Sequence, residues 1–419
     1  MTAKRRKVCG IDVHKGFVVA VTLDCEGNSE TKKYLQDLDS LTDLREWVLK
    51  SNCESVAFES TADYWRPLYA VLEPHIPITV ANAYHIKHIP GKKTDITDAY
   101  WIAELELNGL ISPSRIFKGY YYDLRTLTRY RETLVNNRTD YKNKVHHQLD
   151  LCGIRLCKCM KDIFSKTGYP ILKGITAKKS QEEILEYLPA KSRKHADKFF
   201  SAIPSDIPEN NLLVLESALT MIDNINEQIK QVEERIKFLV NQRRHELRIL
   251  MSIPGVGFIG ATTLLAEIGN VHDFSNSDKL AKWAGLTPSV YQSANTNYTG
   301  PITKQGSPHL RRILVECSHA AVRSSGTLKN YFDKLRPGKC YKKAIVAVAR
   351  KLLRIAWHLL VNDEVFIDDE AMSKDVWIPK MPSKMKKIGF EKIIELLSRG
   401  AEMIIQEEGL EVMRLKLDT

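Results

Sequence analysis

The chain has 419 residues, and its 62 lysines and arginines exceed its 51 acidic residues, giving a formal net charge of +11. A hydrophobic fraction of 43% and a charged fraction of 27% are near globular averages, which excludes a largely disordered chain. The length suggests two or three domains, and the basic balance favours a polyanionic partner. No run reaches the ~20 apolar residues of a membrane span, and no signal peptide is recognisable. We therefore expect a cytoplasmic protein, without a membrane partner, whose eight cysteines are reduced.

The first quarter of the chain alternates strand and helix signals. Strands are predicted over residues 8–13, 16–23, 55–59 and 76–80, and helices over 40–50, 64–72 and 94–107. A strand hairpin followed by such strand–helix units predicts a mixed sheet covered by helices.

The middle of the chain has helical patterns. A long basic helix is expected over 120–151, where it forms a candidate nucleic-acid surface, and shorter helices near 181–187 and 190–201. Apolar residues then follow steps of three and four: Leu215, Ala218, Ile222, Ile225, Ile229, Val232, Ile236 and Leu239. Such a heptad seam needs a partner helix, which is either a helix of the same chain or one of a second copy.

Four carboxylates form a candidate site, and two of them stand at the ends of apolar strands, where a buried charge has to be paired or bound to a metal. Asp12 and Glu59 each end an apolar strand, while Asp95 and Asp98 share one face of a helix that Thr94 is expected to cap. Together at one sheet edge they predict a site for two Mg²⁺ ions, with Mn²⁺ as a substitute. The alternative is structural, because acidic residues also favour turns and first helical turns.

These motifs resemble a known family. The layout resembles the RNase H/RuvC-like nuclease fold. Four sequence motifs, in the same order, resemble those of the N-terminal domain of DEDD insertion-sequence transposases, which are relatives of the Piv and MooV recombinases. The motifs are Gly10–Lys15, Glu59–Thr61, Tyr64–Trp65 and Lys93–Ala99. The resemblance implies that the catalytic metal ligands are Asp12, Glu59, Asp95 and Asp98. Lys15, Lys92 and Lys93 lie near these carboxylates in the sequence and are candidate phosphate contacts.

The second half of the chain resembles the same family independently. Residues 251–269 resemble one helix-hairpin-helix element, in which Gly255 and Gly257 offer backbone N–H groups to a phosphate, although a plain helix-turn-helix remains the alternative. Residues 280–314 resemble the C-terminal domain of these transposases. Basic residues there that are candidate nucleic-acid contacts are Lys304, Arg311 and Arg312.

The resemblance also implies a serine nucleophile. In the family it follows a Gly-Leu-x-Pro segment, a position that matches Ser293, with Ser289 as the fallback. The family commonly has Ser-Ser-Gly there, whereas this chain has Gln-Ser-Ala-Asn at Gln292–Asn295. The assignment of Ser293 therefore rests on a motif that has lost the neighbouring serine and the glycine.

The expected organisation is α/β plus α. A RuvC-like DEDD domain spans 1–115, a helical linker with a coiled coil spans 116–246, and a mostly helical C-terminal transposase domain spans 247–361. The remaining tail, 362–419, carries a predicted helix near 387–406 and no functional prediction.

The resemblance implies a prokaryotic, nucleoid-associated transposase or site-specific recombinase that cuts and rejoins DNA through Ser293 and metal ions. Element ends and target DNA are its expected partners, a homodimer or homotetramer its expected assembly, and a structured bridge RNA a further partner in related recombinases. Three alternatives stay open: a RuvC-like junction endonuclease, a Piv-type DNA invertase and a non-catalytic nucleic-acid-binding regulator.

Overall fold

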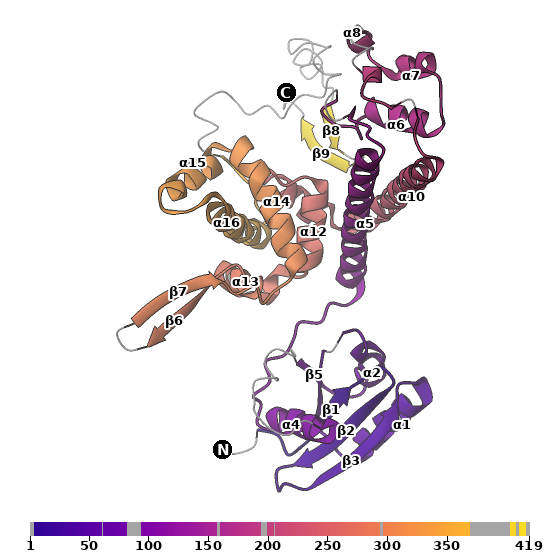
Figure 1. The fold of residues 1–419 in the computed structure, drawn as a ribbon. Helices are drawn as coiled ribbons and strands as arrows, with labels where there is room; N and C mark the ends of the chain where they lie inside the picture. The colour runs from indigo at the N-terminus through magenta and orange to yellow at the C-terminus, as the bar shows by residue number, and fades with distance from the viewer. Residues whose placement is uncertain are drawn as a thin grey trace. The chain divides into compact units, whose positions relative to one another are not determined.

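The computed structural model describes residues 4–60, 62–81, 94–156, 160–193, 199–204, 206–293, 296–368, 403–407 and 410–415. The chain divides into two compact units, Met1–Phe117 and Lys118–Thr419. Each is built as its own packed body (Figure 1). Within the described residues, the helices lack the combination of length and apolar character that a bilayer crossing requires.

The first unit is, as predicted, a mixed sheet with helices, but the sheet has five strands where the sequence predicted four. Its elements are β1 (Lys7–Val13), β2 (Phe17–Asp24), β3 (Ser29–Leu35), α1 (Leu38–Lys50), β4 (Ser55–Glu59), α2 (Trp65–Leu72), β5 (Ile78–Ala81) and α4 (Asp95–Leu107). The strand order is β3-β2-β1-β4-β5. The first three strands form an antiparallel meander, and β4 and β5 run parallel to β1.

Alternation along β1 decides which helix covers which face of the sheet. Cys9, Ile11 and Val13 belong to the core formed with α1 and α2. Val8 lies instead in a cluster with Ala103 of α4. Since successive side chains point to opposite faces, Asp12 shares the α4 face with Val8.

Helix α4 lies directly on this strand. A Cβ atom at Gly10 would come within 2.3 Å of the backbone O of Ala99 and the backbone N of Ala103, so only glycine permits this approach. Towards its other end, α4 is anchored by buried Glu106, whose carboxylate pairs with Arg5 at 2.7 Å and accepts hydrogen bonds from two sheet hydroxyls. The first turn of α4 is thereby fixed near the carboxyl end of β1.

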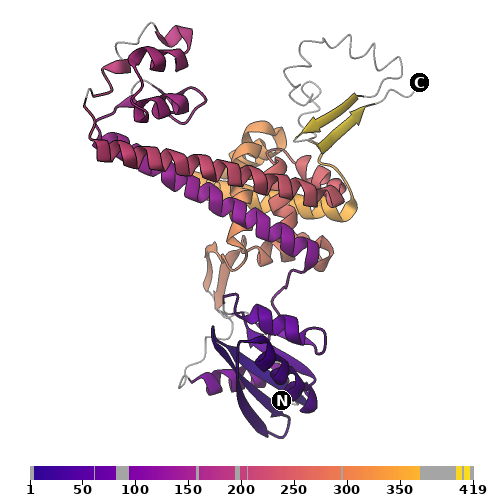
Figure 2. The same cartoon turned by 90° about the vertical axis from the view of Figure 1, so that its right-hand side faces the viewer.

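The second unit is mostly helical and is organised around two long antiparallel helices (Figure 2). These are α5 (Gly119–Leu151) and α10 (Glu209–Val240). Leu124 of α5 clusters with Ile236, near the end of α10, whereas Leu149 clusters with Leu215, near its beginning. The heptad seam therefore packs on a helix of the same chain, which is one of the two partners that the pattern left open.

Small helices lie at one end of this pair and a larger helical body at the other. The first group is α6 (Gly168–Thr176), α7 (Gln181–Tyr187) and α8 (Ala190–Arg193). The second group is α11 (Arg244–Met251), α12 (Phe258–Ile268), α13 (Ser277–Trp283), α14 (Pro308–Ser324), α15 (Gly326–Leu335) and α16 (Tyr341–Asn362). Their apolar side chains form one continuous core, to which α5 contributes Leu124.

Two β-hairpins complete the second unit. Strands β6 (Pro288–Ser293) and β7 (Thr296–Ile302) form a two-stranded ribbon that projects beyond α13 (Figure 1). Strands β8 (Met403–Glu407) and β9 (Leu410–Leu415) pair near the C-terminus. The helix predicted near 387–406 is wrong over its last residues, since Ile404 and Ile405 are β-branched and pair with β9; the rest of it lies outside the described residues.

Candidate functional site

The carboxyl edge of the sheet brings Asp12 and Glu59 together. Ile11 of β1 is in register with Phe58 of β4, and Asp12 and Glu59 come one residue later on these parallel strands. Both point to the face that α4 covers, because their neighbours Ile11 and Phe58 face the opposite core. Glu59 is buried, and 17% of the Asp12 side chain is exposed.

The first turn of α4 supplies the other two carboxylates. The Thr94 hydroxyl accepts a hydrogen bond from the Thr97 backbone N–H, which confirms Thr94 as the N-cap. Asp95 and Asp98 follow in the first turn and are exposed. A helix N-terminus favours such negative charges, so this placement costs α4 little.

The charges of these side chains act on Asp12. Burial raises the pKa of the Asp12 carboxyl, and the charges of Asp98, Asp95 and Glu59 raise this pKa further, whereas His14 lowers it. Four carboxylates from two strands and one helix thus share one electrostatic environment. An environment of this kind is compatible with a divalent cation, because carboxylate oxygens are the ligands of hard divalent ions.

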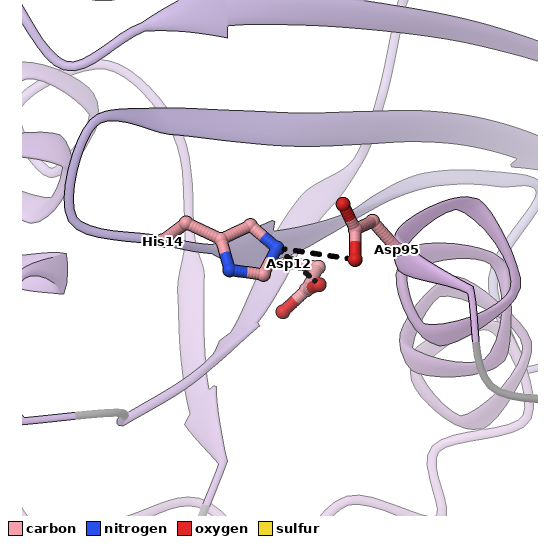
Figure 3. A group of neighbouring side chains, drawn as sticks. All are labelled: Asp12, His14 and Asp95. Carbon is pink, nitrogen blue, oxygen red and sulfur yellow. Dashed lines mark ion pairs between the residues drawn. The ribbon is translucent and has the colours of Figure 1, made fainter.

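His14 is a further member of the cluster that the sequence analysis did not single out. Its Nε2 atom lies 3.0 Å from Oδ2 of Asp12 and 3.5 Å from Oδ1 of Asp95 (Figure 3). The ligand atoms of Asp12, His14 and Asp95 all lie within 4.8 Å of one another, a grouping compatible with a divalent metal ion. The signal was present, since His14 follows Asp12 by two residues and period-two alternation predicts the same face.

The predicted lysines are placed only in part. Lys15 is exposed in the turn between β1 and β2, beside this edge of the sheet. Lys92 and Lys93 lie outside the described residues.

The serine candidates lie on the ribbon of the second unit. Ser293 is the last residue of β6 and is in register with Thr296, so it stands at the closed end of the ribbon. Ser289 lies further back, and its hydroxyl donates a hydrogen bond to the carbonyl of Pro301 on the facing strand. Ala294 and Asn295, which connect the strands, lie outside the described residues.

The glycines of the second unit have different environments. Gly255 has a φ of 82°, and a Cβ atom there would lie 2.4 Å from the backbone N of Ala321, so its role in the structure is close packing of the loop on α14. Gly257 is exposed at the N-cap of α12, which has no side-chain cap. The first N–H groups of α12, which a helix leaves without an intrahelical partner, follow Gly257.

Three basic candidates of this unit differ in what they contact. Lys304 is exposed beyond the ribbon. Arg311 donates hydrogen bonds to the backbone carbonyls of Ala284 and Gly306. Arg312 pairs with Glu132 and Glu316, each at 2.6 Å. Within the described residues, the two arginines have partners inside the protein, whereas Lys304 faces solvent.

Comparison with known proteins matches both halves of the chain. A DEDD transposase model of the IS110 type matches residues 9–154, and a model described as transposase IS116/IS110/IS902 family matches residues 247–333. The chain is 24% identical over 371 residues to the transposase for insertion sequence element IS1111A of Coxiella burnetii, covering 86% of this chain and 91% of that protein.

Two further relatives match over different lengths. A 43.6 kDa protein of insertion element IS110 from Streptomyces coelicolor is 25% identical, covering 68% of this chain and 78% of that protein. The pilin gene-inverting protein of Moraxella bovis is 30% identical over 155 residues, which is 34% of this chain and 48% of that protein.

Proposed function

We propose, for a chain that belongs to the IS110-type family of DEDD transposases, that it cuts and rejoins DNA strands with the four carboxylates of its first unit. The observation that carries this proposal is the meeting of Asp12, Glu59 and the first turn of α4 at one edge of the sheet. The strand order β3-β2-β1-β4-β5, with an antiparallel meander followed by parallel strands, supports an RNase H/RuvC-like fold for this unit.

The residues at this edge fit divalent metal ions. Their donor set is mostly carboxylate oxygen, and Nε2 of His14 is a buried polar atom without a hydrogen-bond partner among the described residues. We propose Asp12, Glu59, Asp95 and Asp98 as the ligands of two Mg²⁺ ions, which Mn²⁺ replaces. When bound, such a pair stabilises the charge on the attacking and leaving oxygens of a phosphodiester.

We propose Ser293 as the nucleophile of the strand-cleavage step. Its Oγ forms a bond to the DNA phosphorus and loses its proton, while the bond from phosphorus to one sugar oxygen breaks and that oxygen takes up a proton and leaves as a hydroxyl. The phosphoserine ester retains the bond energy, so a DNA hydroxyl can later reverse the step without ATP. Support comes from the place of Ser293 at the closed end of the ribbon that β6 and β7 form.

DNA contact is proposed for the exposed candidates. Lys15 beside the carboxylates, Lys304 beyond the ribbon and the α12 N-terminus at Gly257 are exposed and suit phosphate groups. Joining element ends to a target requires two duplexes, which favours a homodimer or homotetramer working at the nucleoid. A structured guide RNA remains a predicted partner, and the basic surface that is not assigned to DNA is its candidate binding site.

A second candidate function has one observation in its favour. The likeness to the pilin gene-inverting protein suits a DNA invertase, which would use the same residues on sites within one replicon. A junction endonuclease would instead use the carboxylates with water and would not need Ser293.

The test is a search for a covalent protein–DNA adduct on denaturing gels. The full chain is incubated with labelled element-junction DNA and Mg²⁺, with and without total RNA from expressing cells. We expect an adduct with the wild type and none with Ser293→Ala or Asp12→Asn, while Ser289→Ala retains it. Cleavage without an adduct, unchanged in Ser293→Ala, would refute the serine mechanism and support the endonuclease.

A further inference from the structure

We infer that His14 is a ligand at the position between Asp12 and Asp95, and that its nitrogen makes this position bind a first-row transition-metal ion such as Mn²⁺ more tightly than Mg²⁺. The inference rests on the proposed function, because it assigns one more residue to the proposed metal site. It assigns this residue a property that carboxylates alone do not provide, namely selectivity among divalent ions.

The distances around His14 are those of neighbouring ligands. Ligands bound at right angles and about 2.1 Å from an ion lie about 3.0 Å apart. The Nε2 atom of His14 lies 3.0 Å from Oδ2 of Asp12 and 3.5 Å from Oδ1 of Asp95. All three side chains point toward a common position in Figure 3. An ion enters such a group without large movement of its side chains.

The Nε2 atom lies within ion-pair distance of Asp12 and Asp95, a contact that attracts only when the imidazole is protonated. It is shielded from solvent and makes no hydrogen bond within the described residues. A buried polar nitrogen without a hydrogen bond costs free energy comparable to a lost hydrogen bond. Coordination of an ion by its lone pair removes that cost and the repulsion among the carboxylates together.

The imidazole is held in position by the hairpin that carries it. The His14 backbone N–H donates to the Phe17 carbonyl at 3.0 Å, and the His14 carbonyl accepts from Nε2 of Gln36 at 3.1 Å. The same Gln36 atom donates to the Tyr64 carbonyl, which ties the turn to the start of α2. The imidazole lies against the Phe17 ring, with 4.6 Å between their centroids. A ligand held in this way requires little ordering when an ion binds.

A nitrogen ligand changes which ion the position prefers. Mg²⁺ takes oxygen ligands and keeps several waters, so an imidazole adds little to its binding. First-row transition ions bind nitrogen donors more strongly, in the order that begins with Mn²⁺ and rises through Co²⁺. The group of two carboxylates and one imidazole therefore favours a transition-metal ion over Mg²⁺.

Paramagnetic Mn²⁺ tests the inference without any measurement of activity. The metal-free full chain is titrated with Mn²⁺ and separately with Mg²⁺ by calorimetry, and the bound Mn²⁺ is examined by pulsed electron paramagnetic resonance for coupling to ¹⁴N. We expect ¹⁴N coupling in the wild type. His14→Gln should abolish it and weaken Mn²⁺ binding about tenfold, with Mg²⁺ binding changed less than about twofold.

Two further variants separate coordination from a structural role. His14→Asp supplies an oxygen ligand, so it should keep Mn²⁺ bound, lose the ¹⁴N coupling and reduce the preference for Mn²⁺ over Mg²⁺. His75→Gln, at an exposed histidine before β5 and so at the opposite end of that strand, should behave as the wild type. Coupling that persists in both His14 variants would overturn the inference.

Asp12→Asn distinguishes failure of this inference from failure of the proposed function. Loss of Mn²⁺ binding in Asp12→Asn, with unchanged binding and coupling in the His14 variants, would leave the metal site standing without His14. Equal Mn²⁺ binding in Asp12→Asn and the wild type, or no binding by either, would reject the site itself and the inference with it.

Discussion

Glu267 of α12 has a side chain with no exposed surface, and it lies between Arg125 and Arg129 of α5 at 3.1 and 2.7 Å. Asp12, which is also largely buried, lies instead among other carboxylates at the edge of the first unit. The two regions place the same chemical group in opposite electrostatic surroundings. The first holds two helices together, and the second gathers carboxylates whose mutual repulsion raises the pKa of Asp12 and is offset by His14 only in part.

The pKa shifts follow this difference. Burial raises the pKa of Glu267, but the hydrogen bond from Arg129 and the charges of Arg125 and Arg129 lower it more, so the net shift is downward. For Asp12 the net shift is upward, since burial and like charges outweigh His14. A carboxylate with a lowered pKa stabilises the fold above its titration range, whereas one with a raised pKa costs stability when charged. The charged carboxylate of Glu267 therefore stabilises the fold, whereas the charged carboxylate of Asp12 is maintained at a cost in stability.

The largest expected effect comes from removing a charge at the carboxylate edge. Asp12→Asn should reduce strand cleavage by roughly 10³-fold or more, because it removes a metal ligand from the transition state. It should also raise the midpoint of thermal unfolding in metal-free buffer, since repulsion with Asp95 and Asp98 is relieved. Gel cleavage assays and calorimetry measure the two effects.

Asp43→Asn, at an exposed aspartate on α1, is the matched control and should change neither property. A metal-free Asp12→Asn protein less stable than the wild type would mean that the Asp12 carboxylate serves the fold after all.

The second unit should respond to charge removal in the opposite direction. Glu267→Gln should lower the free energy of unfolding by about 3 kcal/mol or more, because it leaves two arginines beside a neutral buried side chain. The lowered pKa of Glu267 means that its contribution is full above pH 4.5, the unfolded value, and is lost as the pH falls through the lower folded pKa. Denaturant titrations at several acidic pH values measure both.

Glu316→Gln removes a carboxylate that is 55% exposed and pairs with an arginine of its own helix, so it should cost much less. Equal losses in the two variants would show that burial does not distinguish these pairs.

Sequence patterns predicted the mixed sheet of the first unit because its buried strands and amphipathic helices have clear periods. Strand β3 carries no such signal: its residues are almost all exposed, and it exists because it pairs with β2 along its whole length. The sequence showed His14 beside the Asp12 motif but could not predict that it points toward the carboxylates. The direction of its side chain depends on the hairpin turn, which Phe17 and Gln36 stabilise by hydrogen bonds to His14.

Partners across long sequence separations were the harder part. The heptad of α10 was clear, yet its partner α5 has few apolar residues, and its arginines predicted a nucleic-acid surface. The structure assigns several of these arginines to ion pairs: Arg125 and Arg129 with Glu267, and Arg131 with Glu233. A charge pattern shows that a helix is basic but not which acidic residues face it.

Metal addition should reverse the instability of the first region without affecting the second. At a free concentration about 100 times its dissociation constant, a bound ion stabilises the folded state by about 2.7 kcal/mol. Mn²⁺ should therefore raise the unfolding midpoint of the wild type but not of Asp12→Asn. In Glu267→Gln, Mn²⁺ should raise the unfolding midpoint by as much as in the wild type, although the midpoint without metal is lower. Thermal melts with and without a chelator measure these differences.

The smallest expected effect concerns Arg131 and Glu233, which join α5 and α10 at 2.6 Å and are 20% and 28% exposed. A double-mutant cycle with Arg131→Ala and Glu233→Ala should give a coupling energy of roughly 0.5 kcal/mol, because solvent screens the pair and two long side chains lose rotamer freedom. Denaturant titration of the four proteins measures it. A coupling energy as large as the stability lost in Glu267→Gln would show that charge alone determines how much these ion pairs stabilise the fold. The small coupling energy expected here would show that burial determines it. Burial is the property that Asp12 shares with Glu267, although Asp12 lies among carboxylates instead of arginines.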